Sequence, residues 1–265
     1  MPRRLILLFL ALIFACTLAT MAQTQSPQTP GTTQPAPQIS PPASPQPAAM
    51  PPQTTIVPQR TLSVVVLDPA HGGADQGARG GAGIAESDIV LSFARLLRIS
   101  LEAQGLRVIL TRQANEDPSF DDRSKLVNAQ RGAAFITIHV SSTGQPRTVR
   151  VYSLPHAAFP QSASASPHSG LLPWDSAQSN FVDRSRRLAE LIQIQMAQRF
   201  RGSSETPFEA PVRQLRTVGA PAVAIEVSSI SVGDRAPLDQ MGPGLADGVA
   251  RAVAAFRTIY ESGGK

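Results

Sequence analysis

The chain has 265 residues and a net charge of +5 at pH 7, but its charges are unevenly distributed. Arg3, Arg4 and Arg60 are the only charged residues among the first 60, so residues 61–265 hold 21 basic against 19 acidic side chains. A nearly balanced chain with one Trp and two Tyr has neither a basic stripe nor stacking aromatic side chains, which disfavours nucleic-acid binding.

Residues 1–22 are predicted to be a secretory signal peptide. The basic pair Arg3-Arg4 precedes an apolar run of 18 residues, Leu5 to Ala22, which ends in small residues suited to cleavage. A retained membrane anchor is the alternative, because this run is near the lower limit for spanning a bilayer. Lipidation at Cys16 is a further alternative. Cys16 is the only cysteine, so cleavage after Ala22 would exclude disulfides, a thiol nucleophile and zinc–thiolate sites.

Residues 23–60 are predicted to be a disordered linker. Residues 23–59 carry no charge and contain 11 of the chain's 24 prolines, together with many Gln, Thr, Ser and Ala residues. Such a composition cannot bury a core and should stay extended. The linker is either a spacer from a membrane or a tail without a role, and residues 61–265 are predicted to form the globular domain.

From residue 61 onward, short apolar runs alternate with helix-like segments, which predicts a single α/β domain. We expect a mixed, mostly parallel twisted sheet with helices on both faces. Segment 155–178 fits no element, and a loop of this length is typical of a lid or a binding loop. The predicted strands are 62–67, 106–110, 135–139, 149–154 and 223–227, and the predicted helices are 87–104 (capped by Ser87 and ended by Gly105), Asp121 or Asp122 to Arg131, 179–200 and 245–260.

Two histidines lie where predicted strands end. His71 lies in the turn Asp68-Pro-Ala-His-Gly-Gly73, whose glycines let the backbone bend close to a ligand. His139 ends a buried apolar run. For each histidine alone, a structural role in a tight turn or a hydrogen-bonded core remains an alternative, and His156 and His168 are expected to be solvated.

Two glutamates complete the set of candidates. Glu86 precedes a predicted helix and, taken alone, fits a partner of the helix dipole. Glu226 ends the run Pro221–Glu226, where an ionised carboxylate is costly unless it is paired or bound to a metal. A salt bridge with Arg112 or Arg123 is therefore the alternative for Glu226. Two imidazoles and two carboxylates near the ends of buried strands are typical of a catalytic zinc site with a general base.

In this combination, residues 62–260 resemble the zinc-dependent N-acetylmuramoyl-L-alanine amidases of the amidase-3 type. The family's Asp-Pro-Gly-His-Gly-Gly turn is similar to Asp68–Gly73, its Asp-x-Gly-Ala-x-Gly to Asp75–Gly80, its Glu-x-Asp to Glu86–Asp88, its Leu-Thr-Arg to Leu110–Arg112, its Arg and Ala-Asn to Arg123 and Asn128, its Ser-Ile-His to Thr137–His139, its Glu-Val-Tyr to Arg150–Tyr152, and its Pro-Ala-Val-Leu-Val-Glu to Pro221–Glu226. So many matches in the same order argue against a chance resemblance.

The resemblance implies roles for the four candidates. His71, Glu86 and His139 would hold Zn²⁺, and Glu226 would be the catalytic carboxylate that moves a proton from water to the leaving amine. The implied substrate is peptidoglycan, cleaved at the amide between N-acetylmuramic acid and L-alanine of the stem peptide during wall remodelling and daughter-cell separation. The protein would then be exported and act in the periplasm or outside the cell.

The chain also departs from the family pattern. Ala70 replaces a glycine, at a cost of about 1 kcal/mol if that position needs a positive φ. The residues that follow His139 and Glu226 are changed as well, to Val140-Ser141 and Val227–Ser231. These changes spare the implied ligands and fall on loops expected to face the substrate.

Two other functions stay open at this point. One is a catalytically weak peptidoglycan-binding or regulatory protein on the same fold, and the other is a zinc peptidase that cleaves within the stem peptide. A protein activator and a membrane tether through the N-terminus also stay open. Segment 155–178 is hypothesised to be an inhibitory lid, because it is long and lies between a predicted strand and the long helix.

Overall fold

The computed structural model describes residues 61–159 and 173–262. The predicted signal peptide (1–22), the predicted linker (23–60) and residues 160–172 of the hypothesised lid lie outside the described residues. Six strands form one sheet: β1 (Val64–Pro69), β2 (Arg107–Leu110), β3 (Ala133–Ser141), β4 (Thr148–Ser153), β5 (Phe208–Glu209) and β6 (Ala222–Ser228). The helices are α1 (Glu86–Glu102), α2 (Phe120–Asn128), α3 (Val182–Arg199), α4 (Arg213–Arg216), α5 (Ala236–Asp239) and α6 (Gly242–Glu261), with 3₁₀ turns at Gly81–Gly83, His156–Ala158 and Trp174–Phe181.

The sheet is mixed and mostly parallel, as predicted. Its strand order is β2-β1-β3-β6-β4-β5, and β2, β1, β3 and β6 run parallel to one another. β4 runs antiparallel to β6, because only residues 142–147 connect it to β3 and a parallel return would need a long crossover. The carboxyl ends of β1, β3 and β6 therefore meet at one edge of the sheet.

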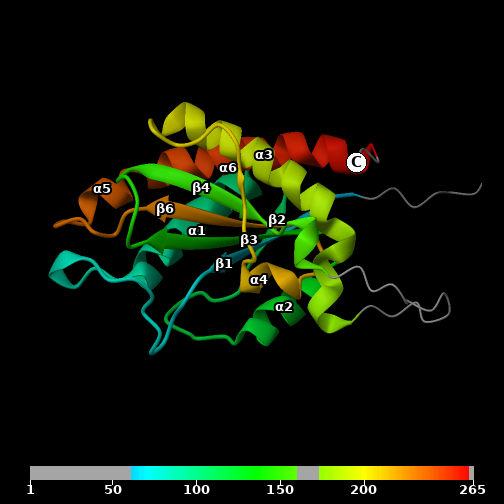
Figure 1. The fold of residues 1–265 in the computed structure, drawn as a ribbon, viewed down its shortest axis with the longest axis horizontal. Coiled ribbons are helices and arrows are strands. Elements are labelled where there is room, and N and C mark those ends of the chain that lie inside the picture. Colours follow the sequence, from blue (N-terminus) through cyan, green and yellow to red (C-terminus); the bar gives the residue numbers. More distant parts are fainter. Residues whose placement is uncertain (1–60, 160–172, 263–265) are drawn as a thin grey trace, which may run out of the picture. The chain divides into compact units, whose positions relative to one another are not determined.

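Helices cover both faces of the sheet, which confirms the predicted α/β architecture (Figure 1). α1, α3 and α6 pack on one face over the larger apolar core, and α2 and α4 cover the other face over a smaller one. Alternate residues of a strand point to opposite faces, so Val65 and Leu67 of β1 join the larger core, while Val64 and Val66 join the smaller one. Asp68 follows on the face that holds the smaller core, at the point where polar side chains replace apolar ones.

Some predicted helix boundaries were wrong. α1 begins at Glu86 after Ala85, and Ser87 lies buried within the helix instead of capping it. α2 is capped by Ser119, whose hydroxyl oxygen accepts from the amide of Asp122, so neither Asp121 nor Asp122 is the cap. The predicted helix from residue 179 is a 3₁₀ turn up to Phe181, and β5, α4 and α5 are too short to produce a detectable period.

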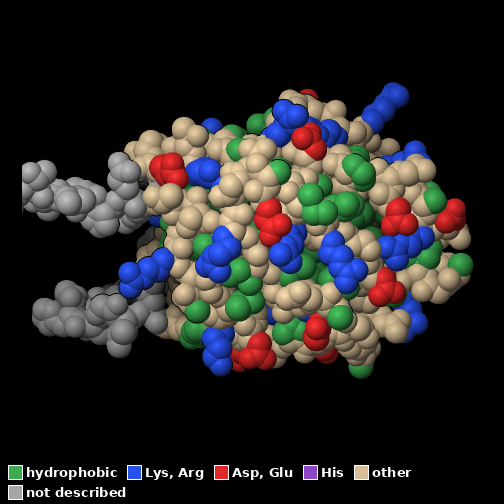
Figure 2. All heavy atoms as spheres, turned by 180° about the vertical axis from the view of Figure 1, so that it is seen from behind, with side chains coloured by type: hydrophobic (Ala, Val, Ile, Leu, Met, Phe, Trp, Pro, Cys, Tyr) green, Lys and Arg blue, Asp and Glu red, His purple; other side chains and the backbone are tan. Residues whose placement is uncertain are grey.

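The surface of the domain agrees with its small net charge. On the face shown in Figure 2, basic and acidic side chains are interspersed rather than gathered into patches of one sign. Within residues 61–159 and 173–262, no helix is both long and apolar enough to cross a membrane.

We expect the larger core to carry much of the domain's stability. Leu97 is fully buried on α1, whereas Ile99 on the same helix is 65% exposed. Leu97→Ala should lower the free energy of unfolding by about 2–5 kcal/mol because it leaves a cavity. Ile99→Ala should change it by no more than about 0.5 kcal/mol. Denaturant unfolding followed by circular dichroism measures both, and equal effects would contradict this assignment of the core.

Candidate metal centre

His71 is placed by a sharp turn directly after β1. Three consecutive residues, His71, Gly72 and Gly73, have positive φ angles of 63°, 133° and 56°. A left-handed conformation is uncommon for a residue with a side chain, and here Arg123 supports it by donating from Nη2 to the His71 carbonyl at 3.0 Å. Ala70 is not among the residues with positive φ, so the cost considered for Ala70 does not arise there.

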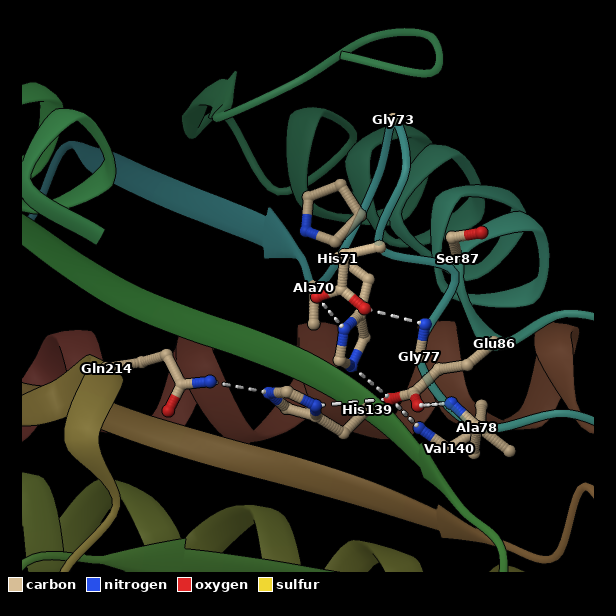
Figure 3. A network of polar contacts seen from close by, with 12 residues as sticks. Ala70, His71, Gly73, Gly77, Ala78, Glu86, Ser87, His139, Val140 and Gln214 are labelled. Carbon is tan, nitrogen blue, oxygen red and sulfur yellow. Dashed lines mark hydrogen bonds and ion pairs between the residues drawn. The ribbon is translucent and has the colours of Figure 1, made fainter. Parts of the chain in front are cut away.

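Glu86 joins the two histidines. Its Oε1 lies 3.2 Å from His71 Nε2 and 3.1 Å from His139 Nδ1 (Figure 3). The amides of Val140 and Ala78 donate to its two carboxylate oxygens at 2.9 and 2.8 Å. The side chain is buried, so these four donors replace the water that an ionised carboxylate would otherwise bind.

The three side chains form a donor group that fits a metal ion. One ligand atom from each of His71, Glu86 and His139 lies within 4.8 Å of the other two, and the imidazole rings stand perpendicular with centroids 5.4 Å apart. Within the described ranges this is the one such group of His, Cys, Asp and Glu. Two imidazole nitrogens and one carboxylate oxygen are a donor set typical of zinc sites that keep a coordination position open.

Asp75 fixes the orientation of His71. Its Oδ2 lies 2.7 Å from His71 Nδ1, which leaves Nε2 directed toward Glu86. A carboxylate behind a ligating histidine is a common outer contact of metal sites. The close packing also requires a glycine at position 77, where a Cβ would lie 2.5 Å from Glu86 Oε2 and 2.6 Å from His71 Cδ2.

His139 also has neighbours on its far side. Thr137 Oγ1 and Gln214 Nε2 each lie 3.5 Å from His139 Nε2, which is long for a hydrogen bond. Sequence reasoning missed Gln214, because α4 is a single turn far from His139 along the chain. His156 lies elsewhere, 2.9 Å from Asp183, and His168 lies outside the described residues.

A buried ion pair between Asp68 and Arg123 stabilises the turn after β1. Asp68 is 1% exposed and accepts from Arg123, from Thr111 at 2.6 Å and from Thr137 at 2.8 Å. The same Arg123 guanidinium donates to the His71 carbonyl. The end of β1 is thereby tied to α2 and to β3.

The two arginines considered as partners of Glu226 are engaged elsewhere. Arg123 pairs with Asp68, and Arg112 donates to the carbonyls of Pro69 and Ser87 at 2.8 Å each. A salt bridge from Glu226 to either arginine was therefore a wrong alternative.

Glu226 lies beside the donor group and pairs with Arg150. β3 and β6 pair His139 directly with Glu226, so both side chains rise from the same face of the sheet. Arg150 Nη2 lies 3.1 Å from Glu226 Oε1, and the Tyr152 hydroxyl donates to the same oxygen at 3.4 Å. Burial and the nearby Glu226 charge raise the pKa of Tyr152.

A cavity of about 200 Å³ opens on the other side of the centre. Its walls come from the end of β1 and the turn after it, the segment before α2, α2 itself and α4: Asp68, Ala70, His71, Asp75, Asp117, Pro118, Ser119, Phe120, Arg123 and Gln214. His71 is the member of the donor group that lines this cavity, whereas His139 is paired across the sheet with Glu226.

The contacts of the donor group shift its protonation. The hydrogen bond to Glu86 is the main cause that raises the pKa of His71 to about 9; burial opposes it, and Asp75 adds to it. Burial alone would raise the pKa of Glu86. The hydrogen bonds from His139, His71 and the amides of Ala78 and Val140 outweigh that effect and hold this pKa well below its usual range.

Two imidazoles and two carboxylates at the carboxyl edge of a mostly parallel sheet are the arrangement of a metal-dependent hydrolase. The sequence comparison narrows that class. Residues 65–251 match the N-acetylmuramoyl-L-alanine amidase family Amidase_3, and the chain belongs to this family.

Individual relatives agree with the family match. The chain is 28% identical over 218 residues to N-acetylmuramoyl-L-alanine amidase AmiC of Neisseria meningitidis serogroup B, covering 72% of this chain and 52% of that protein. It is 38% identical over 96 residues to AmiC of Escherichia coli, covering 34% of this chain and 22% of that protein. The chain thus spans about half, or less, of the length of these curated relatives.

Solved structures show the same fold. The amidase Ami1 from Mycobacterium smegmatis aligns with a TM-score of 0.57 at 21% identity, over 76% of this chain and 99% of that one. An N-acetylmuramoyl-L-alanine amidase from Clostridium difficile 630 aligns with a TM-score of 0.57 at 20% identity, over 74% of this chain and 97% of that one.

Metal binding should depend on pH because of His71. With a pKa of about 9, the imidazole is protonated at pH 7.5 in the metal-free protein and must lose that proton to become a ligand. We expect Zn²⁺ binding to release at least one proton, and the affinity to rise about tenfold per pH unit until roughly pH 9. Calorimetry in buffers of different ionisation enthalpy measures the released protons. Binding without proton release would contradict the predicted charge state.

The outer contact from Asp75 should contribute to metal affinity. Asp75→Asn keeps the shape of the side chain but removes the charge behind His71, so Zn²⁺ affinity should fall about 10- to 100-fold. Asp239→Asn is the matched control, because Asp239 pairs with Arg235 at the surface. Competition with a fluorescent chelator compares the two variants, and equal affinities would show that Asp75 does not act through His71.

Proposed function

We propose that this protein is an exported zinc amidase that cleaves peptidoglycan between N-acetylmuramic acid and the L-alanine of the stem peptide. The observation that carries the proposal is the convergence of His71, Glu86 and His139 with Glu226 beside them in a chain of this family. The first three residues would hold Zn²⁺, and Glu226 would act on protons.

The donor set fits zinc chemistry. A zinc ion at this position would supply a Lewis acid, which polarises a carbonyl and makes water a better nucleophile at neutral pH. The protein's own part is to hold the ligands in place. Asp75 orients His71, while the amides of Ala78 and Val140 fix the Glu86 carboxylate.

Glu226 has the position that a proton-transfer group needs. It lies next to His139 across the β3–β6 pair and is 27% exposed, so water and substrate can reach its carboxylate. We infer that Glu226 takes a proton from the attacking water and delivers it to the amide nitrogen, which leaves as the free amine of L-alanine.

The two rival functions are less well supported. A protein that only binds peptidoglycan needs neither a preorganised donor group nor a reachable carboxylate beside it. A peptidase acting within the stem peptide would use the same groups, and only the position of the cut separates it from an amidase.

The cellular setting is proposed from the sequence. Residues 1–22 would direct export, with membrane anchoring or lipidation at Cys16 as alternatives, and residues 23–60 would be a spacer. The enzyme would then act in the periplasm or outside the cell, on peptidoglycan, in wall remodelling and daughter-cell separation. The proposal also allows for a protein activator as a partner.

Digestion of purified peptidoglycan by the full chain tests the proposal, with products identified by mass. We expect release of intact stem peptides that begin with L-alanine, and a chelator should abolish it. Glu226→Gln should lower the rate by about 10²- to 10⁴-fold while Zn²⁺ still binds, because Glu226 is not among the donor group. Glu190→Gln on α3 is the matched control and should keep full activity.

The other outcomes are equally specific. New termini within the peptide would identify a peptidase. Stoichiometric zinc binding without any cleavage would favour a binding protein or a required activator, and loss of zinc binding altogether would overturn the proposed site.

A further inference from the structure

Arg150 is a charged side chain of the site for which the proposed reaction has no use. It lies on β4 directly opposite Glu226 and is 31% exposed. Its Nη2 lies 3.1 Å from Glu226 Oε1 and donates to Ser228 Oγ, also at 3.1 Å. Gly144 packs against this nitrogen so closely that a Cβ there would lie 2.7 Å from it.

The proposed reaction requires the stem peptide to lie on one particular side of the candidate metal centre. A group that delivers a proton to the leaving amine must lie next to that nitrogen. The nitrogen belongs to L-alanine, so the stem peptide must extend on the side of Glu226. Across the sheet the order is His139 on β3, Glu226 on β6 and Arg150 on β4, so the peptide would run toward Arg150.

The spacing sets which part of the peptide reaches Arg150. Neighbouring strands lie about 4.8 Å apart, so Arg150 stands about 10 Å from His139 across the sheet. An extended peptide advances about 3.5 Å per residue. A group one or two residues beyond L-alanine would therefore lie over Arg150.

Arg150 is the basic group that would attract an acidic part of the substrate at this point. Glu226, Asp75 and Asp117 are acidic and border the centre or its cavity, and the buried Arg123 is committed to Asp68. A guanidinium has five N–H donors, and the contacts of Arg150 to Glu226 and Ser228 both use Nη2. Arg150 thus offsets the charge of Glu226 and offers further donors in the geometry that suits a carboxylate.

We propose that Arg150 is a specificity-determining residue that binds a carboxylate of the stem peptide, one or two residues beyond the scissile amide. This inference rests on the proposed amidase function, because the position of the leaving amine places the peptide over β4. Ser228 and Glu226 hold the guanidinium on the rigid sheet before the substrate arrives.

A second arginine near the centre provides a matched comparison. The Arg213 guanidinium stacks on the ring of Phe120, with 4.6 Å between Cζ and the ring centroid, and Phe120 lines the cavity near His71. Arg213 therefore stands on the side away from Glu226, where the muramoyl group would lie. Replacing Arg213 changes the charge by the same amount without touching the peptide side.

The test uses two substrates, both N-acetylmuramoyl-L-alanine extended by glutamate, with the glutamate carboxylates free in one and amidated in the other. The zinc-loaded full chain should prefer the free acid about 10- to 100-fold in kcat/KM, mainly through KM, as expected for a charged hydrogen bond. In Arg150→Gln this preference should fall to near one, and Arg150→Lys should restore part of it. Arg213→Gln should keep it.

Two results would overturn the inference. If Arg150→Gln slows both substrates equally, Arg150 only orients Glu226; if Arg213→Gln removes the preference instead, the carboxylate is recognised on the other side. Binding of both substrates to the metal-free chain separates this inference from the amidase function. If the enzyme cleaves neither substrate, an acid preference in binding that is lost in Arg150→Gln still supports the carboxylate site, and no preference overturns it.

Discussion

The centre depends on one buried carboxylate, that of Glu86. It is 4% exposed, and an ionised carboxylate so far from water is stable only with full hydrogen bonding. Its partners are His71, His139 and the amides of Ala78 and Val140. These groups come from the turn after β1, the segment before α1 and the end of β3, so satisfying one carboxylate fixes three separate pieces of chain. The donor group is thereby held together before any ion binds.

A second buried charge holds the turn in an unusual shape. Burying the Asp68–Arg123 pair removes two ions from water, and such pairs often contribute little net stability. The pair fixes the backbone of the turn, because Arg123 also donates to the carbonyl of His71, a residue in the left-handed region. Arg112 does the same for the carbonyls of Pro69 and Ala70. Two buried cations thus stabilise backbone that a regular strand or helix would not provide.

Much of this arrangement could be predicted from the sequence. Apolar periodicity predicted the longer strands and helices, and polar residues at strand ends predicted which edge carries the site. The partners of those residues could not be predicted, because Asp75, Gln214 and Arg150 approach the site only through the turn, α4 and β4. The apolar periodicity of the sequence carries no information on such contacts. It also does not reveal that β4 runs antiparallel to β6. Capping by Ser119 was missed because nearby aspartates are equally good caps by type.

Because of the direction of β4, side chains on the two sides of the candidate metal centre are held with different rigidity. Had β4 been parallel to β6, its carboxyl end and the following loop would lie at the site. Because β4 is antiparallel, Arg150 and Tyr152 face Glu226 from within a strand that pairs with β6 from Thr148 to Tyr152 and with β5 at Tyr152 and Ser153. The opposite side is built from the turn after β1, the segment before α2, α2 and the single turn α4. Groups on strands are held more firmly than groups on loops, so the Glu226 side is suited to fixed geometry and the cavity side to accommodating different groups.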